Sequence, residues 1–151
     1  LEDPDRRASS AQVMERLLAW GVVPIVNEND TVTSEEIRVG DNDTLSARVA
    51  ALIGADLLVL LSDVDGFYPA DPHSHPGLRP LTVVSPDDDL DAMAGGAGSA
   101  NGTGGMVTKV AAARICAAHG IPMVLAHGDR PGVLRSIMAG EEIGTLFVRE
   151  G

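Results

Sequence analysis

The segment 57–61, Leu-Leu-Val-Leu-Leu, is apolar at every position and is followed directly by Ser62 and Asp63. A strand without a polar face is typical of a parallel sheet that helices cover on both sides. Apolar residues at helical spacing, such as Leu45 and Val49, precede it. We therefore expect an α/β fold, a three-layer α-β-α sandwich with a mostly parallel central sheet.

Helix and strand signals alternate along the rest of the chain. Ser9 and Ser10 are candidate N-caps of the first helix, and Gly21 and Gly54 are stop signals after helices. Pro24 lies within an apolar run, which is then a short buried or edge strand. The expected helices cover residues 9–20, 41–53, 86–94, 106–119 and 131–139, and the expected strands cover 22–26, 57–61, 81–84, 122–126 and 145–148.

The chain is acidic. Its 151 residues carry 11 Lys and Arg against 22 Asp and Glu, which gives a formal net charge of −11 at pH 7. A nucleic-acid-binding surface needs clustered cations, so the charge argues against that class of function. Hydrophobic residues make up 44% of the chain, which predicts a folded domain. Lys109 is the only lysine, and the other ten cations are arginines.

Cys116 is the only cysteine, so the chain cannot form an internal disulfide and we expect a reducing compartment, the cytoplasm. No apolar run reaches the ~20 residues that a membrane-spanning helix needs. Residues 1–7 are mostly charged and do not resemble a signal peptide. Because the chain opens without Met, we expect residues 1–7 to be disordered or to derive from cloning.

Two clusters of Asn and Asp flank the start of the expected helix 41–53. The first is Asn27-Glu28-Asn29-Asp30, after the expected strand 22–26, and the second is Asp41-Asn42-Asp43. Amide groups donate hydrogen bonds to a carboxylate and Asp accepts them from an ammonium group, so the clusters suit an amino-acid ligand. The alternative is capping and turn formation, for which Asp and Asn are favoured residues.

Ser62 and Asp63 stand at the carboxyl end of the apolar strand. In open α/β sheets, ligands bind beyond the carboxyl ends of the strands. A hydroxyl and a carboxylate at this place suit a nucleotide and Mg²⁺, which prefers one or two protein carboxylates together with phosphate oxygens. The Asp65-Gly66 pair that follows is an ordinary turn former. No metal site is assigned.

The segment 102–109, Gly-Thr-Gly-Gly-Met-Val-Thr-Lys, opens an expected helix. Glycines let backbone N–H groups approach an anion, and the helix N-terminus favours negative charge. We expect Lys109 in the first turn, where a cation opposes the helix dipole, so a phosphate-binding role is favoured over a structural one. The segment matches neither the Walker A nor the dinucleotide-binding pattern. The alternative, a flexible linker, fits Gly95 to Gly102 better.

Four motifs together resemble the amino acid kinase family. They are Val-Pro-Ile-Val-Asn-Glu-Asn-Asp (23–30), Val-Gly-Asp-Asn-Asp-Thr-Leu-Ser-Ala (39–47), Leu-Leu-Ser-Asp-Val-Asp-Gly-Phe-Tyr (60–68) and Gly-Thr-Gly-Gly-Met-Val-Thr-Lys (102–109). The resemblance implies the amino acid kinase, carbamate kinase-like fold and an ATP-dependent phosphorylation in which ATP carries Mg²⁺. The two Asn- and Asp-rich motifs favour L-glutamate as the substrate, phosphorylated on its γ-carboxylate in the first step of proline biosynthesis. Two alternatives stay open: a family member that acts on aspartate, acetylglutamate or UMP, and a non-catalytic nucleotide- or amino-acid-binding module.

The resemblance also implies a role for each matching residue. Asp30 and Asn42 would bind glutamate, with Asn27 nearby. Asp43 would orient the catalytic lysines, and Lys109 would steady the charge on the transferred phosphoryl group. The residues implied to contact the nucleotide are Ser62, Asp63, Thr103, Gly104, Gly105, Met106, Val107, Thr108 and Lys109. Two family traits, a homo-oligomeric state and feedback inhibition by proline, are implied as well.

The resemblance runs from about Ala8 to Phe147 and begins in the middle of the family domain. The family's Gly-rich N-terminal loop, with a second phosphate-binding lysine, and a further glutamate-contacting serine have no match here. Nor does the C-terminal RNA-binding-like domain that some members carry. We therefore expect one partial kinase domain over residues 1–151, with its N-terminal part missing and with poor activity alone.

Overall fold

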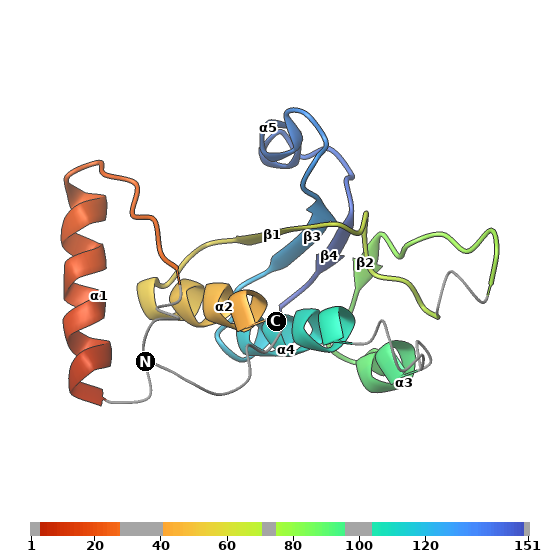
Figure 1. The fold of residues 1–151 in the computed structure, drawn as a ribbon, viewed down its shortest axis with the longest axis horizontal. Coiled ribbons are helices and arrows are strands. Elements are labelled where there is room, and N and C mark those ends of the chain that lie inside the picture. The colour runs from red at the N-terminus through yellow and green to blue at the C-terminus, as the bar shows by residue number, and fades with distance from the viewer. Residues whose placement is uncertain (1–3, 28–40, 71–74, 96–103, 150–151) are drawn as a thin grey trace.

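The computed structural model describes residues 4–27, 41–70, 75–95 and 104–149. Helices and strands are interspersed along the chain, and they alternate one by one only from α4 to β4 (Figure 1). In chain order the elements are α1 (Pro4–Ala19), α2 (Asp41–Ile53), β1 (Leu58–Ser62), β2 (Val83–Val84), α3 (Leu90–Gly95), α4 (Gly104–Ala118), β3 (Met123–His127), α5 (Val133–Met138) and β4 (Thr145–Phe147). None of the helices in this part of the chain is long and apolar enough to cross a lipid bilayer.

The four strands form one mixed sheet in the order β1-β3-β4-β2. The pairs β1–β3 and β2–β4 are parallel, and only β3–β4 is antiparallel, so the expected mostly parallel sheet is confirmed. The register of the longest pair places Leu58 opposite Met123 and Ser62 opposite His127. The carboxyl ends of β1 and β3 therefore meet at one edge of the sheet.

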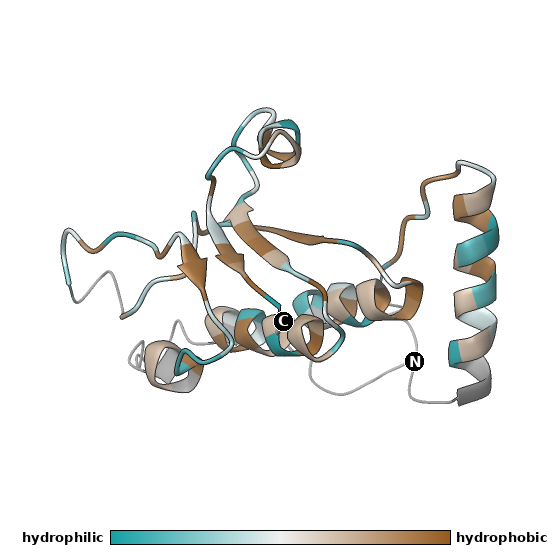
Figure 2. Ribbon diagram, turned by 180° about the vertical axis from the view of Figure 1, so that it is seen from behind, coloured by the Kyte–Doolittle hydropathy of each residue, from teal (hydrophilic) through white to brown (hydrophobic). Residues whose placement is uncertain are grey.

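Helices cover both faces of the sheet, which confirms the three-layer expectation (Figure 1). α2, α3 and α4 lie on one face, and the short α5 lies on the other. The larger core cluster joins the first face to α2 and α4, where small side chains such as Ala47 and Ala112 let the helices approach each other closely. A smaller cluster of Val124, Ala126 and Val133 lies under α5. Figure 2 shows the strands as predominantly hydrophobic, as expected for a sheet covered on both sides.

The segment 22–26 does not form the expected strand. Residues 22–27 have no regular secondary structure, and the side chains of Val23 and Ile25 are 84% and 96% exposed. Pro24 has no backbone N–H to donate to a neighbouring strand, which weakens the pairing of such a short run. Apolar composition alone was therefore a misleading strand signal here.

Helix α1 begins at Pro4, several residues before the N-cap expected at Ser9 or Ser10. A proline is favoured in the first turn of a helix, because its missing N–H would have no intrahelical partner there. Residues 4–7 thus belong to this helix.

Two other elements are shorter than expected because local polar contacts replace them. The Asp88 carboxylate accepts a hydrogen bond from the backbone N–H of Ser85 at 2.7 Å, so the expected helix 86–94 begins only at Leu90. Leu81 forms an isolated antiparallel bridge with Phe67, so the expected strand 81–84 is limited to Val83–Val84.

Candidate active site

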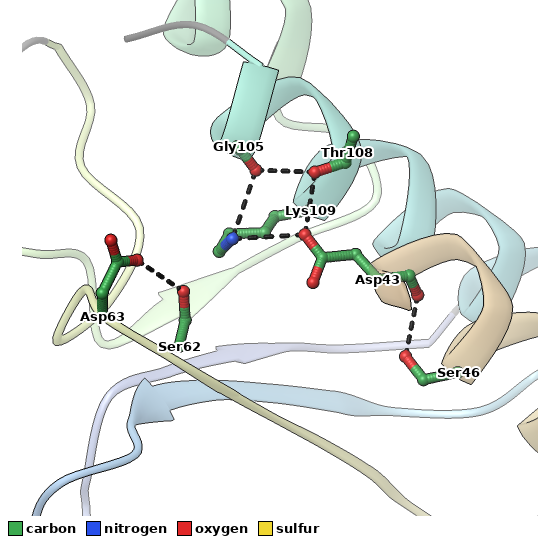
Figure 3. Close-up of polar contacts among 7 residues, drawn as sticks. All are labelled: Asp43, Ser46, Ser62, Asp63, Gly105, Thr108 and Lys109. Atoms are coloured by element: carbon green, nitrogen blue, oxygen red, sulfur yellow. Dashed lines mark hydrogen bonds and ion pairs between the residues drawn. The ribbon is translucent and has the colours of Figure 1, made fainter. Parts of the chain in front are cut away.

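The candidate site lies where the carboxyl ends of β1 and β3 meet the first turns of α2 and α4 (Figure 3). Its centre is an ion pair between Lys109 of α4 and Asp43 of α2, with 3.2 Å between Nζ and Oδ2. Lys109 is only 7% exposed, so the pair is largely shielded from water. Because charges interact more strongly away from water, this pair holds α2 and α4 in a defined relation at the site.

Lys109 lies in the second turn of α4 rather than in the expected first turn, because the helix already begins at Gly104. From this position its ammonium group bends back toward the helix start, where Nζ donates to the carbonyl oxygen of Gly105 at 3.3 Å. The side chain therefore brings a positive charge close to the helix N-terminus, which already favours anions.

Thr108 is a third member of this cluster. Its Oγ1 lies 2.8 Å from Asp43 Oδ2 and 2.9 Å from the carbonyl oxygen of Gly105. The first turn of α2 is closed by Ser46, whose hydroxyl donates to the Asp43 carbonyl oxygen at 2.8 Å (Figure 3). The Asp43 carboxylate thus projects from an ordered helix start toward two consecutive residues of α4.

Ser62 and Asp63 lie across from Lys109 at the end of β1 (Figure 3). The Ser62 hydroxyl donates to Asp63 Oδ1 at 2.9 Å, and this bond is the main cause of the lowered pKa of the Asp63 carboxyl. The backbone N–H of Asp63 lowers the pKa further, and the electrostatic effects of the nearby Lys109 and His127 side chains act in the same direction. An exposed, ionised carboxylate beside a fixed hydroxyl fits the few oxygen contacts that a Mg²⁺–nucleotide complex takes from a protein.

The turn after Asp63 is held by buried contacts. The Phe67 backbone N–H donates to Thr145 Oγ1 at 2.7 Å, and the Phe67 ring packs edge-on against Phe147 with 5.5 Å between ring centroids. Gly66 is required in this turn, because a Cβ there would lie 2.8 Å from both Pro80 Cβ and Thr145 Oγ1. The expected Asp65-Gly66 turn therefore has a packing reason, and it keeps the end of β1 in place.

Asn27 and Asn42, two of the predicted substrate-binding residues, line one cavity of about 510 Å³. Its remaining wall comes mainly from apolar side chains of α2, such as Leu45 and Val49. Asn42 directly precedes Asp43 in the first turn of α2, whereas neither Asp43 nor Lys109 lines this cavity. The third predicted substrate-binding residue, Asp30, lies outside the described residues.

The other predicted nucleotide-binding residues open helix α4. Gly104 is its first residue, and Thr103 lies outside the described residues. Met106 packs against the hydrophobic core, whereas the side chain of Val107 is 55% exposed. Within residues 4–27, 41–70, 75–95 and 104–149, no three His, Cys, Asp or Glu side chains come together to hold a metal ion.

Sequence reasoning missed His127, the last residue of β3. Met123 and Leu125 pack in the core on the α4 side of the sheet, so the period-two alternation places His127 on that face, opposite Ser62. Its Nδ1 accepts a hydrogen bond from the Asp129 backbone N–H at 3.2 Å, so the neutral ring carries its proton on Nε2. Extending the expected strand 122–126 by one residue would have found it.

The sequence profile of the amino acid kinase family matches residues 1–127. The glutamate 5-kinase of Symbiobacterium thermophilum is 87% identical over 151 residues, which are all of this chain and 58% of the relative. That of Carboxydothermus hydrogenoformans is 56% identical over 143 residues, 94% of this chain and 38% of the relative. The chain thus spans between about two fifths and three fifths of the length of these curated relatives.

Solved structures are similar in fold. The UMP kinase of Bacillus anthracis superimposes with a TM-score of 0.62 at 17% identity and covers 96% of this chain and 52% of its own. The uridylate kinase of Archaeoglobus fulgidus superimposes with a TM-score of 0.53 at 25% identity and covers 70% of this chain and 46% of its own. At this level of identity the first likeness concerns the fold alone.

Proposed function

The chain belongs to the amino acid kinase family, and we propose that it forms the nucleotide side and part of the substrate pocket of a glutamate 5-kinase. The reaction would transfer the terminal phosphoryl group of ATP to the γ-carboxylate of L-glutamate, which yields glutamyl 5-phosphate for proline biosynthesis. The observation that carries the proposal is the buried Lys109–Asp43 pair at the start of α4, beside Ser62 and Asp63. The proposal of glutamate as the substrate rests on the names of the relatives at 87% and 56% identity.

The geometry suits a reaction that needs no protein nucleophile. The substrate carboxylate itself attacks the phosphoryl group, so the protein has to position two anions and offset their charge. In the proposed role, Lys109 places its ammonium on the transferred phosphoryl group, and Asp43 anchors that ammonium at 3.2 Å. The exposed Asp63 carboxylate is a candidate contact for a Mg²⁺ ion bound to ATP, which would supply further charge neutralisation.

Asn27 and Asn42 are proposed to bind glutamate, together with Asp30. Support comes from the cavity that Asn27 and Asn42 share, and from the place of Asn42 directly before Asp43 in α2. Amide groups of Asn donate to a carboxylate, which glutamate carries at both ends. The apolar wall of α2 then faces the aliphatic part of the substrate.

The wider setting is proposed from the family resemblance. We propose a cytoplasmic protein that assembles as a homo-oligomer and is inhibited by proline. The single Cys116 is a buried free thiol.

The test is ADP release with glutamate, aspartate, acetylglutamate or UMP as the acceptor. It should be run on this chain and on a chain extended to the full length of the Symbiobacterium thermophilum relative. We expect the extended chain to release ADP with glutamate only, and this chain to be much slower. An extended chain that fails with glutamate overturns the proposal, and turnover with another acceptor reassigns the substrate.

The role of Lys109 has its own test. In the extended chain, Lys109→Arg should lower kcat about 100-fold, because the planar guanidinium cannot reproduce the compact ammonium between Asp43 and a phosphate. The control is Arg135→Lys, an exchange of the same two residue types at an exposed position of α5. Activity of Lys109→Arg equal to that of the control would refute the assigned role.

A further inference from the structure

Two consecutive side chains of α4 converge on one carboxylate oxygen of α2. Asp43 Oδ2 lies 2.8 Å from Thr108 Oγ1 and 3.2 Å from Lys109 Nζ (Figure 3). The three groups are only partly accessible, with 16% exposure of the Asp43 side chain and 8% of that of Lys109. A hydroxyl bound to a largely shielded carboxylate fixes the orientation of that carboxylate more firmly than the same contact would in water.

The hydroxyl proton of Thr108 is already committed inside the protein. A threonine hydroxyl has one proton, and the two acceptors within reach are Asp43 Oδ2 and the Gly105 carbonyl oxygen, at 2.8 and 2.9 Å. The lone pairs of the hydroxyl oxygen can only accept hydrogen bonds. A phosphate group of ATP carries no proton to donate to them at neutral pH. Thr108 is therefore poorly suited to donate to the nucleotide, which is the role that the family resemblance implied.

The same geometry makes Thr108 important for Lys109. The ammonium group has three N–H bonds, of which two point to Asp43 Oδ2 and to the Gly105 carbonyl oxygen. One N–H is left for a bound phosphate. If the Asp43 carboxylate turned, the ammonium would follow it and this N–H would no longer point to a fixed place. The rate constant would then fall, because phosphoryl transfer depends on the alignment of the reacting groups.

We propose that Thr108 is a positioning residue that acts through Asp43: its hydroxyl orients the carboxylate that holds the Lys109 ammonium, and it does not bind the nucleotide. The kinetic part of this proposal rests on the proposed kinase function. The structural part, that the Thr108 hydroxyl sets the environment of the Lys109 ammonium, holds whether or not the chain is a kinase.

The structural part can be tested without any activity, because Lys109 is the only lysine among the 151 residues. Lysine labelled with ¹³C at Cε gives this chain a single side-chain NMR signal, which needs no assignment. Thr108→Val removes the hydroxyl and keeps the shape, and we expect it to move the signal toward its position in urea. Thr108→Ser keeps the hydroxyl and should leave the signal in place. Circular dichroism verifies the fold of each variant, and Thr108→Ala replaces the valine variant if that one fails to fold.

The kinetic part uses the chain extended to the length of its relative. Thr108→Val should lower kcat about tenfold and leave the KM for ATP within about twofold, as expected for the loss of one hydrogen bond to a charged group. Thr108→Ser should restore most of the kcat. The proposal is overturned if Thr108→Val raises the KM for ATP and leaves kcat unchanged. It is also overturned if the NMR signal of Lys109 has the same position in Thr108→Val as in the unsubstituted chain. If the unsubstituted extended chain shows no turnover, the kinase function fails, while the NMR comparison still decides the role of Thr108.

Discussion

Replacing Asp43 by Asn should destabilise the folded chain by about 3 kcal/mol, which is near the lower end of the range for breaking a buried ion pair from one side. The substitution leaves the Lys109 ammonium in a site where the residue is only 7% exposed. At 3.2 Å and an effective dielectric constant of about 20, the lost attraction is about 5 kcal/mol. Part of this lost free energy is recovered, because the ammonium still contacts the asparagine oxygen, the Gly105 carbonyl oxygen and some water.

Lys109→Met should cost much less, about 1 kcal/mol, because it removes the charge that is hard to bury and keeps the length of the side chain. The Asp43 carboxylate left behind retains its hydrogen bond from Thr108 at 2.8 Å and is 16% exposed to water. The double variant Asp43→Asn/Lys109→Met should resemble Lys109→Met alone, so the coupling free energy between the two positions is expected to be about 3 kcal/mol.

Urea unfolding of the four chains, followed by far-UV circular dichroism at pH 7 and low salt, measures these free energies. The matched control is Asp56→Asn, the same substitution at an exposed carboxylate, which should change stability by less than about 0.5 kcal/mol. The reasoning is refuted if Asp43→Asn costs no more than this control. It is also refuted if the free energies of the two single variants simply add in the double variant, because the two side chains would then not interact.

Three further outcomes follow from buried or close contacts. Gly144→Ala would place a Cβ 2.0 Å from a carbonyl oxygen of β3 at φ +72°, so it should destabilise the chain by more than about 3 kcal/mol in the same urea assay. The control is Gly140→Ala, at φ +82° with open space around the added Cβ, which should cost about 1 kcal/mol. Burial raises the pKa of the Cys116 thiol to about 11 from 9.0, so a thiol-reactive dye at pH 8 should label only the unfolded chain. The neutral thiol is the favoured form in the fold, so its contribution to stability is constant below pH 9.0 and is lost as the pH rises toward about 11, which the urea midpoint would report. In the extended chain, His127→Ala should raise the KM for ATP about fivefold and His119→Ala, at the far end of α4, should not; equal KM values would exclude His127 from the nucleotide site.

Much of the architecture could be read from local patterns. The uniformly apolar segment 57–61 predicts a covered parallel strand, and β1 occupies Leu58–Ser62. The helix expected over 41–53 is found at those residues, and Gly54 beyond it adopts φ +62°. These predictions succeed because helical and strand periodicities are local, and because only glycine adopts such a backbone angle without strain.

Local patterns fail where tertiary contacts compete with them. The run 22–26 looks like a strand by composition, yet only pairing with another strand would make it one, and residues 22–27 have no such partner within the described part of the chain. Pro4 was overlooked as a helix start, although its position in the first turn has a local physical reason.

The sequence by itself determined the fold class, the order of most elements and the residue types that could handle a phosphorylated ligand. It also singled out Lys109, the one lysine, near the start of a helix that follows a glycine-rich segment. Only the tertiary structure decided which groups this lysine meets. Asp43 and Thr108 stand 65 residues apart in the chain, and they touch because α2 packs against α4 on one face of the sheet. Such a contact depends on the packing of two helices through small side chains, which no periodicity within either helix encodes.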